Sequence, residues 1–159
     1  NRLPGPPGSS LNHDTIGILA RGLDGHLAAA CTTSGMAFKM RGRVGDSPQA
    51  GAGLFLEKGV GAAASTGVGE EVTRIAGTAR VIASMRAGLS PQKACEEAVK
   101  HIVRLRGEAI KGMQVGFLAL GQDGTVGAYA LLPGFTYAVT RHSGAAEVLP
   151  SASLFAQAG

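Results

Sequence analysis

The sequence lacks tryptophan, has only two cysteines and contains no long apolar run. The missing tryptophan excludes no fold or function. Cys31 and Cys95 lie far apart and fit no metal-ligand spacing, so we expect both to be buried thiols. No apolar run approaches the roughly 20 residues of a membrane-spanning helix, so we expect no membrane span. Aromatic residues make up 4% of the chain and the basic residues are scattered, so the net charge of +4 does not indicate a nucleic-acid partner.

What the chain does contain is a globular composition rich in glycine. A hydrophobic content of 45% and 25 glycines in 159 residues indicate one folded domain with many tight turns, or half of a larger one. Residues 1–14 differ from the rest, because three prolines and two glycines fall within the first eight positions. They predict an extended, mobile tail.

Two β-hairpins are predicted, one near each end of the folded part. In residues 15–33 and 115–132, apolar runs flank an Asp-Gly pair, at positions 24–25 and 123–124 respectively. A further strand is expected at residues 135–140. The two hairpins together suggest an antiparallel sheet.

Between the hairpins the apolar spacing becomes helical. Apolar residues three and four apart predict a helix over residues 72–83, with carboxylates at 70–71 in its first turn and its end at Gly88. A second helix is predicted between Ser90, its N-cap, and Gly107. This order of elements predicts an α+β fold. Two helices cover one sheet face, so the other face needs a layer from another segment.

Three patterns of possible chemical interest have simpler explanations. Residues 59–65 match the spacing G-x-G-x-x-A, but no helix follows directly, and we interpret residues 62–66 as a strand of small side chains. The four histidines show no paired spacing, so no metal site is predicted. The hydroxyls at positions 9–10 with His13 and Asp14 match a hydrolase triad in composition only, because neighbours in a tail cannot hold its geometry.

Thr15, within the segment NHDTIG, is the main candidate for chemistry. A threonine hydroxyl is a weak nucleophile that needs a base, and Asp14, with an ordinary pKa of about 4, is a poor one. A better base arises only if the chain is cut before Thr15. The simpler interpretation is a β-branched residue that begins a strand. The predicted hairpin, however, brings Thr32 and Thr33 close to it.

Two other segments carry groups suited to binding. Arg43 and Asp46 are opposite charges three residues apart in a loop with several glycines. As a surface pair they would contribute little, but together they could bind a zwitterion through its carboxylate and ammonium groups. Residues 66–69, TGVG, lie at a predicted strand-to-helix turn, where backbone N–H groups and a hydroxyl can stabilise an oxyanion.

In combination, these segments resemble one known family. NHDTIG, HLAAACTTSGMAFKM, RGRVGDSP, GAGLF and ASTGVGEE are similar to the glycosylasparaginases, or aspartylglucosaminidases, within the N-terminal nucleophile hydrolases. By this resemblance residues 15–159 form a β subunit, and residues 1–14 form a linker and the end of an α subunit. The resemblance implies a four-layer αββα sandwich of which this chain supplies about half. It also implies an αβ heterodimer that can pair further, no cofactor or metal, and a lysosomal, periplasmic or secreted location.

The resemblance also implies how the protein works. The chain would cut itself between Asp14 and Thr15, with His13 and Asp14 taking part. The freed α-amine of Thr15, with an unperturbed pKa near 8, would then accept the proton of its own hydroxyl. That hydroxyl would attack the side-chain amide of N4-(β-N-acetylglucosaminyl)-L-asparagine.

The remaining roles follow by the same resemblance. Thr33 supports the nucleophile, and the Thr66 hydroxyl and the Gly67 N–H form the oxyanion hole. Arg43 binds the substrate's α-carboxylate, Asp46 binds its α-amino group, and Gly69 belongs to the same binding site. Two alternatives stay open. GRVGDSP and the TG-G turn are shared with plant-type L-asparaginases and isoaspartyl peptidases, and an uncut chain would be a non-catalytic precursor or partner-binding subunit.

Overall fold

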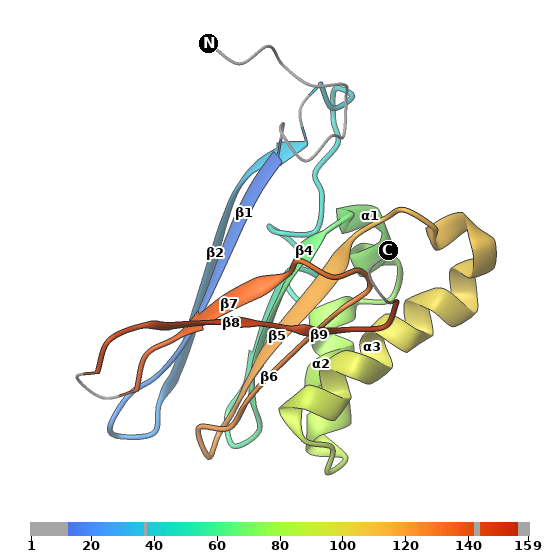
Figure 1. The fold of residues 1–159 in the computed structure, drawn as a ribbon. Coiled ribbons are helices and arrows are strands. Elements are labelled where there is room, and N and C mark those ends of the chain that lie inside the picture. The colour runs from blue at the N-terminus through green and yellow to red at the C-terminus, as the bar shows by residue number, and fades with distance from the viewer. Residues whose placement is uncertain (1–12, 37, 142–143, 156–159) are drawn as a thin grey trace.

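The computed structural model describes residues 13–36, 38–141 and 144–155, without the side chains of residues 13–14 (Figure 1). Helices and strands are combined in an α+β fold, as predicted. The prediction of a tail is wrong for residues 13–14, whose backbone pairs with β2 and so belongs to the first strand, and the rest of the predicted tail lies outside the described residues. The elements are β1 (His13–Arg21), β2 (Leu27–Met36), β3 (Leu54–Glu57), β4 (Gly61–Gly67), α1 (Gly69–Arg74), α2 (Gly77–Arg86), α3 (Pro91–Arg106), the 3-10 helix η1 (Gly107–Ile110), β5 (Val115–Gly121), β6 (Val126–Ala130), β7 (Thr136–Val139), β8 (Glu147–Pro150) and β9 (Ala152–Ser153).

The strands form a five-stranded sheet, in the order β3-β4-β5-β6-β9, and two two-stranded sheets, β1-β2 and β7-β8. Both predicted hairpins form, but β1-β2 is separate from the sheet that contains β5-β6. In addition, β9 pairs with β6 in parallel. The expectation of one antiparallel sheet that contains both hairpins is therefore wrong, although every described strand pair other than β6-β9 is antiparallel. An Asp-Gly turn specifies how two neighbouring strands pair, but not which other strand lies at their edge.

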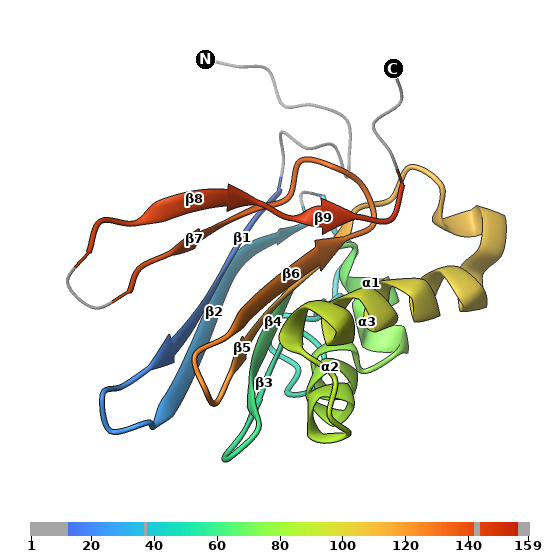
Figure 2. The ribbon, with the colours of Figure 1, turned by 60° about the horizontal axis from the view of Figure 1, so that its bottom comes forward.

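The five-stranded sheet lies between a layer of helices and the β1-β2 hairpin (Figures 1 and 2). Helices α2 and α3 pack on one face, α2 mainly against β3 and β4 and α3 against β5 and β6. On the other face, β1 contacts β4 and β5. The two helices thus cover one face, as predicted, and the hairpin begins the layer on the other. None of the described helices is long and apolar enough to cross a membrane.

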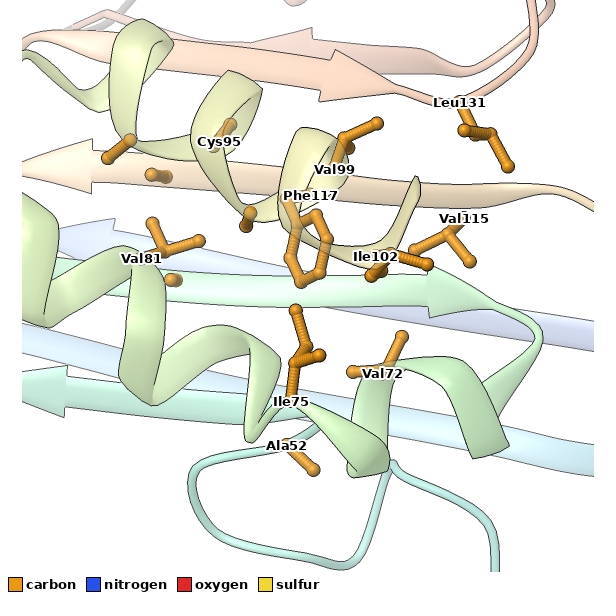
Figure 3. Packing of buried hydrophobic residues seen from close by; sticks show 14 of the residues in the cluster. Ala52, Val72, Ile75, Val81, Cys95, Val99, Ile102, Val115, Phe117 and Leu131 are labelled. Atoms are coloured by element: carbon orange, nitrogen blue, oxygen red, sulfur yellow. The ribbon is translucent and has the colours of Figure 1, made fainter. Parts of the chain in front are cut away.

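The hydrophobic core fills the space between the helices and the five-stranded sheet (Figure 3). Phe117 of β5 is fully buried at its centre, close to Ile75 and Ile102 from the helical side. Burying an aromatic or large aliphatic side chain contributes roughly 1.5–3 kcal/mol. The segment GAAAS of β4 is buried throughout, as a central strand covered on both faces must be. This confirms the strand of small side chains predicted there.

The first predicted helix is divided into two. α1 ends near residue 75, and α2 starts after Ala76, which adopts a left-handed conformation with φ of 48°. The N–H groups of Thr78 and Ala79 donate to the carbonyl groups of Ala52 and Gly51 at 3.2 and 2.9 Å. The start of α2 is therefore tied to the loop before β3. The apolar spacing continues across the break, so the sequence alone predicts one helix.

The second predicted helix forms as expected. The Ser90 hydroxyl accepts the N–H of Lys93 at 3.4 Å, and Gly107 is the C-cap residue. Cys95 in this helix is fully buried, and burial raises the pKa of its thiol. Cys31 is only half-buried, so the prediction of two buried thiols is wrong for that residue. Its Sγ atom donates to the Ser47 carbonyl at 3.2 Å.

Gln122 joins the turns of three hairpins. They meet at the end of the β1-β2 hairpin that is opposite to Thr15. Its side-chain Nε2 donates to the carbonyl of Gly25 at 2.6 Å, and its Oε1 accepts the N–H of Gly59 at 3.1 Å. Its own carbonyl accepts Nε of Arg21 at 2.7 Å. These bonds link the β1-β2 and β3-β4 turns to the β5-β6 turn, and so help to fix the hairpin on the sheet.

We expect Gln122→Ala to lower the free energy of unfolding by about 1–2 kcal/mol, because two side-chain hydrogen bonds are lost. Urea unfolding of the full-length protein measures this change. Lys58→Ala, an exposed change in the β3-β4 turn, is the control and should stay within about 0.5 kcal/mol of the wild type. Equal stability of the two variants would show that the two side-chain hydrogen bonds of Gln122 contribute nothing.

Candidate active site

Thr15 lies near the start of β1, opposite Thr33 of β2. The two Oγ1 atoms are 3.0 Å apart, and Thr33 Oγ1 also accepts the N–H of Gly35 at 2.9 Å. The strand register shifts between Asp14, which lies opposite Gly35, and Thr15, so that Ser34 is skipped. An irregularity of the hairpin, of the kind that re-aims side chains, therefore falls at the bond that the sequence predicts to be cut.

β4 ends in a turn formed by Thr66 and Gly67. Gly67 has φ of 110°, and a Cβ atom there would lie 2.1 Å from the carbonyl oxygen of Gln114. The N–H of the following residue, Val68, donates to this Gln114 oxygen at 2.9 Å. Only glycine fits this backbone conformation and this contact. The turn is thus held against the loop that precedes β5.

Asp46 is buried, with 8% of its surface exposed, and several contacts fix its position. Ser65 Oγ donates to Oδ2 at 3.1 Å, and the Asp46 carbonyl accepts the N–H groups of Gln49 and Gly53 at 2.9 and 3.1 Å. A Cβ atom at Gly69 would lie 2.5 Å from Oδ1. Gly69 therefore packs directly against the carboxylate, and any larger residue would displace it.

Arg43 forms an ion pair with Glu70 of α1. Arg43 Nε donates to Oε1 at 2.7 Å, and Nη2 donates to Oε2 at 3.1 Å. The hydrogen bonds with Arg43 lower the pKa of Glu70, and the same bonds raise the pKa of Arg43, with a smaller contribution from the charge of Asp46. The pair joins the loop after β2 to the first turn of α1.

These elements surround a cavity of about 610 Å³, a size that suits a small ligand. One side is formed by predicted site residues, namely Thr15, Thr33, Arg43, Asp46, Thr66 and Gly67. The other side comes from Met113, Gln114 and residues 132–135, in the loops that precede β5 and β7. Gly69 lies behind Asp46. The structure thus brings together predicted site residues from four separate segments of the sequence.

Some predicted features stay untested. The side chains of His13 and Asp14 lie outside the described part of the chain, so their predicted role in self-cleavage remains a prediction. Within the described part, no group of three His, Cys, Asp or Glu side chains is placed to hold a metal ion. The predicted absence of a metal or cofactor likewise remains a prediction.

Sequence reasoning missed three residues that shape the site. Ser65 and Glu70 hold Asp46 and Arg43, and the side-chain amide of Gln114 accepts the N–H of Leu132 and donates to its carbonyl, both at 2.8 Å. The sequence pattern indicates Glu70 only as a carboxylate in the first turn of a helix. It lies 27 residues from Arg43, and no local sequence pattern spans such a separation.

The sequence is similar to several known proteins. A sequence model of the asparaginase family matches residues 4–149. The chain is 54% identical over 136 residues to an N(4)-(Beta-N-acetylglucosaminyl)-L-asparaginase of Elizabethkingia miricola, and the match covers 84% of this chain and 40% of that protein. It is 42% identical over 91 residues to an N(4)-(Beta-N-acetylglucosaminyl)-L-asparaginase of Rattus norvegicus, covering 57% of this chain and 26% of that protein.

A further relative is a putative N(4)-(beta-N-acetylglucosaminyl)-L-asparaginase of Drosophila melanogaster. It is 35% identical over 135 residues, which are 84% of this chain and 33% of that protein. The chain therefore spans at most 40% of the length of these relatives.

Proposed function

Because the chain belongs to the asparaginase family, we propose that it is the nucleophile-bearing part of a glycosylasparaginase. Its predicted resemblance to the glycosylasparaginases is confirmed by relatives that carry this name. The proposed reaction is hydrolysis of the amide bond in N4-(β-N-acetylglucosaminyl)-L-asparagine. One observation carries the proposal. A nucleophile, a candidate oxyanion turn and a pair of opposite charges line the same cavity.

Thr15 supplies the nucleophile in this proposal. As long as residue 14 is joined to Thr15, the nitrogen of Thr15 is an amide and cannot accept a proton. Cleavage before Thr15 would convert it into an amine, which can take the proton from Oγ1 at neutral pH. The Thr33 hydroxyl, 3.0 Å away, is placed to orient Oγ1 for attack.

The proposed reaction proceeds in two steps, through an ester between the substrate and Thr15. Oγ1 attacks the side-chain amide carbon, and the oxyanion that forms is stabilised by the Thr66 hydroxyl and the Gly67 N–H. When this intermediate collapses, the C–N bond breaks and the amine of Thr15 returns its proton to the departing glycosylamine. Water then hydrolyses the β-aspartyl ester, which releases aspartate and restores the Thr15 hydroxyl.

The charged end of the substrate is bound by Arg43 and Asp46. A guanidinium binds a carboxylate through two parallel hydrogen bonds, and a buried carboxylate is a good partner for an ammonium group. Both groups are free only in an asparagine that is not part of a peptide. This accounts for a preference for a glycosylated single amino acid over a glycopeptide.

The other part of the protein is proposed to be an α subunit that packs on the β1-β2 hairpin. Ile16 and Ile18 have 52% and 60% of their surfaces exposed, whereas Gly17 between them packs against Ala64 of the five-stranded sheet. A second cavity, of about 410 Å³, is lined by residues 15–19 of the hairpin, by residues 64–66 and Leu118 of the five-stranded sheet, and by residues 135–138. Exposed apolar surface of this kind marks an interface. In this assignment residues 1–14 end the α subunit, residues 15–159 form the β subunit, and the missing fourth layer comes from the partner.

Turnover by the full-length protein tests the proposed reaction. Glycosylated asparagine should be hydrolysed in preference to β-aspartyl dipeptides, whereas the opposite preference would identify an isoaspartyl peptidase. Mass spectrometry of the same preparation should find a fragment that begins at Thr15. An intact chain without turnover would instead indicate a partner-binding subunit.

We expect Arg43→Lys to raise KM for glycosylated asparagine by about 10- to 100-fold, because a lysine cannot form the paired hydrogen bonds. Cleavage before Thr15 should be unchanged, since Arg43 takes no part in it. Steady-state kinetics and mass spectrometry measure the two effects. Arg86→Lys is the control, because Arg86 pairs with Glu57 and not with a residue of the cavity. If the KM of Arg43→Lys equalled that of the wild type, Arg43 would not be a substrate-binding residue.

A further inference from the structure

Glu70 does not line the cavity of Thr15, but it forms an ion pair with Arg43, which does. Arg43 lines the cavity of Thr15, whereas Glu70 lines an adjoining surface hollow with Gln49 and Thr73. The two share Val44 and Gly45 in their walls. The Glu70 side chain is 47% exposed and that of Arg43 is 18% exposed. Glu70 therefore contacts Arg43 but does not line the cavity in which a small ligand would lie.

We propose that Glu70 is a positioning residue for amino-acid recognition, which holds the Arg43 guanidinium so that its other edge faces the α-carboxylate of the substrate. The inference rests on the proposed function, since it concerns the same substrate. Glu70 itself does not touch the substrate.

The geometry of the pair leaves one edge of the guanidinium for a ligand. Arginine carries five N–H donors in a rigid plane. Glu70 uses Nε and one N–H of Nη2, so the edge formed by Nη1 and the other N–H of Nη2 is outside this pair. Nη1 lies beside Gly45, 3.0 Å from where a Cβ atom would be, and Gly45 lines both the cavity and the hollow of Glu70. Because the group is planar, fixing one edge orients the other.

Holding the arginine in advance strengthens binding. A free arginine side chain has many rotamers, and a ligand that must order it binds more weakly. Glu70 orders the side chain before the substrate arrives. Its negative charge opposes the incoming carboxylate, but this repulsion is weakened by solvent because Glu70 is half exposed. We therefore expect the ordering of the Arg43 side chain to outweigh this repulsion, so that Glu70 strengthens substrate binding.

The position of Glu70 in the chain adds a second argument. Ser65, which holds Asp46, directly precedes the oxyanion turn, and Glu70 follows Gly69 at its other end. One short segment, residues 65–70, thus carries the proposed oxyanion hole and the residues that fix both charged anchors. This arrangement sets the distance between the substrate's charged end and its reacting amide.

Glu70→Gln in the full-length protein tests the inference. We expect KM for glycosylated asparagine to rise about tenfold and kcat to stay within about twofold, since only ground-state and transition-state binding of the carboxylate is lost. Glu70→Asp keeps the charge but shortens the side chain, and should raise KM as well. Glu57→Gln, which breaks the pair with Arg86, is the matched control and should leave both constants unchanged.

Two measurements separate positioning from a general structural role. Adding Glu70→Gln to Arg43→Lys should raise KM no further, because both act on the same contact. An analogue with an α-carboxamide should be hydrolysed equally by the wild type and Glu70→Gln. An unchanged KM in Glu70→Gln would overturn the inference, and a lower KM would show that Glu70 competes with the substrate. Both results leave the proposed function standing, whereas a wild type without turnover overturns both.

Discussion

Replacing Thr15 with alanine should leave the full-length protein uncut between residues 14 and 15 and should abolish hydrolysis of glycosylated asparagine. The same Oγ1 atom is the proposed nucleophile in both reactions, so no second group can restore either one. Loss of a nucleophile that works as a unit with its base lowers turnover by about 10⁴-fold or more. Mass spectrometry detects the uncut chain, and release of the glycosylamine measures turnover.

The control for this experiment is Thr32→Ala. Thr32 lies beside Thr33 in β2 and is paired with Ile16, but its exposed side chain points to the opposite face of the hairpin. This variant should be cut and should turn over substrate like the wild type. Cleavage of Thr15→Ala at the original bond would refute the proposed self-cleavage. Turnover by the uncut wild-type chain would refute the role of the freed amine.

The proximity of Thr15 and Thr33 could be predicted, because it depends only on the turn and the two strands of one hairpin. An Asp-Gly pair between two apolar runs predicts a tight hairpin, and the lengths of the runs then place its open end. The same applies to α3, whose cap residues at both ends are visible in the sequence. The skipped residue, Ser34, could not be predicted, because an irregular register leaves no mark in the pattern of apolar residues.

The contacts of Arg43 and Asp46 could not be predicted for a different reason. Both residues lie in a loop between β2 and β3, and their partners Glu70 and Ser65 belong to later elements. Such contacts exist only when the loop is folded back over β4 and α1. The far wall of the cavity, with Gln114, depends likewise on how two distant loops pack. Resemblance to a family supplied the roles of the predicted residues, but the residues that hold them became visible only in the structure.

Replacing Gly67 with alanine should lower kcat for glycosylated asparagine by about 10²–10³-fold, the usual effect of losing one oxyanion donor. A Cβ atom at this position would collide with the carbonyl oxygen of Gln114, 2.1 Å away. The turn must then move, and the Gly67 N–H moves with it. Single-turnover measurements on protein already cut before Thr15 isolate the chemical step from any effect on cleavage.

Gly88→Ala is the matched control for Gly67→Ala. Gly88 has a similar φ of 100°, but a Cβ atom there would have no neighbour within 4 Å among the described residues. Both variants carry the backbone strain of alanine at positive φ, so both should lose stability, by roughly 1–2 kcal/mol. Only Gly67→Ala should also lose catalysis, because only there does the new methyl group displace the turn. If the two variants kept the same kcat, the TGVG turn would not be the oxyanion site, and another donor in the cavity would have to take its place.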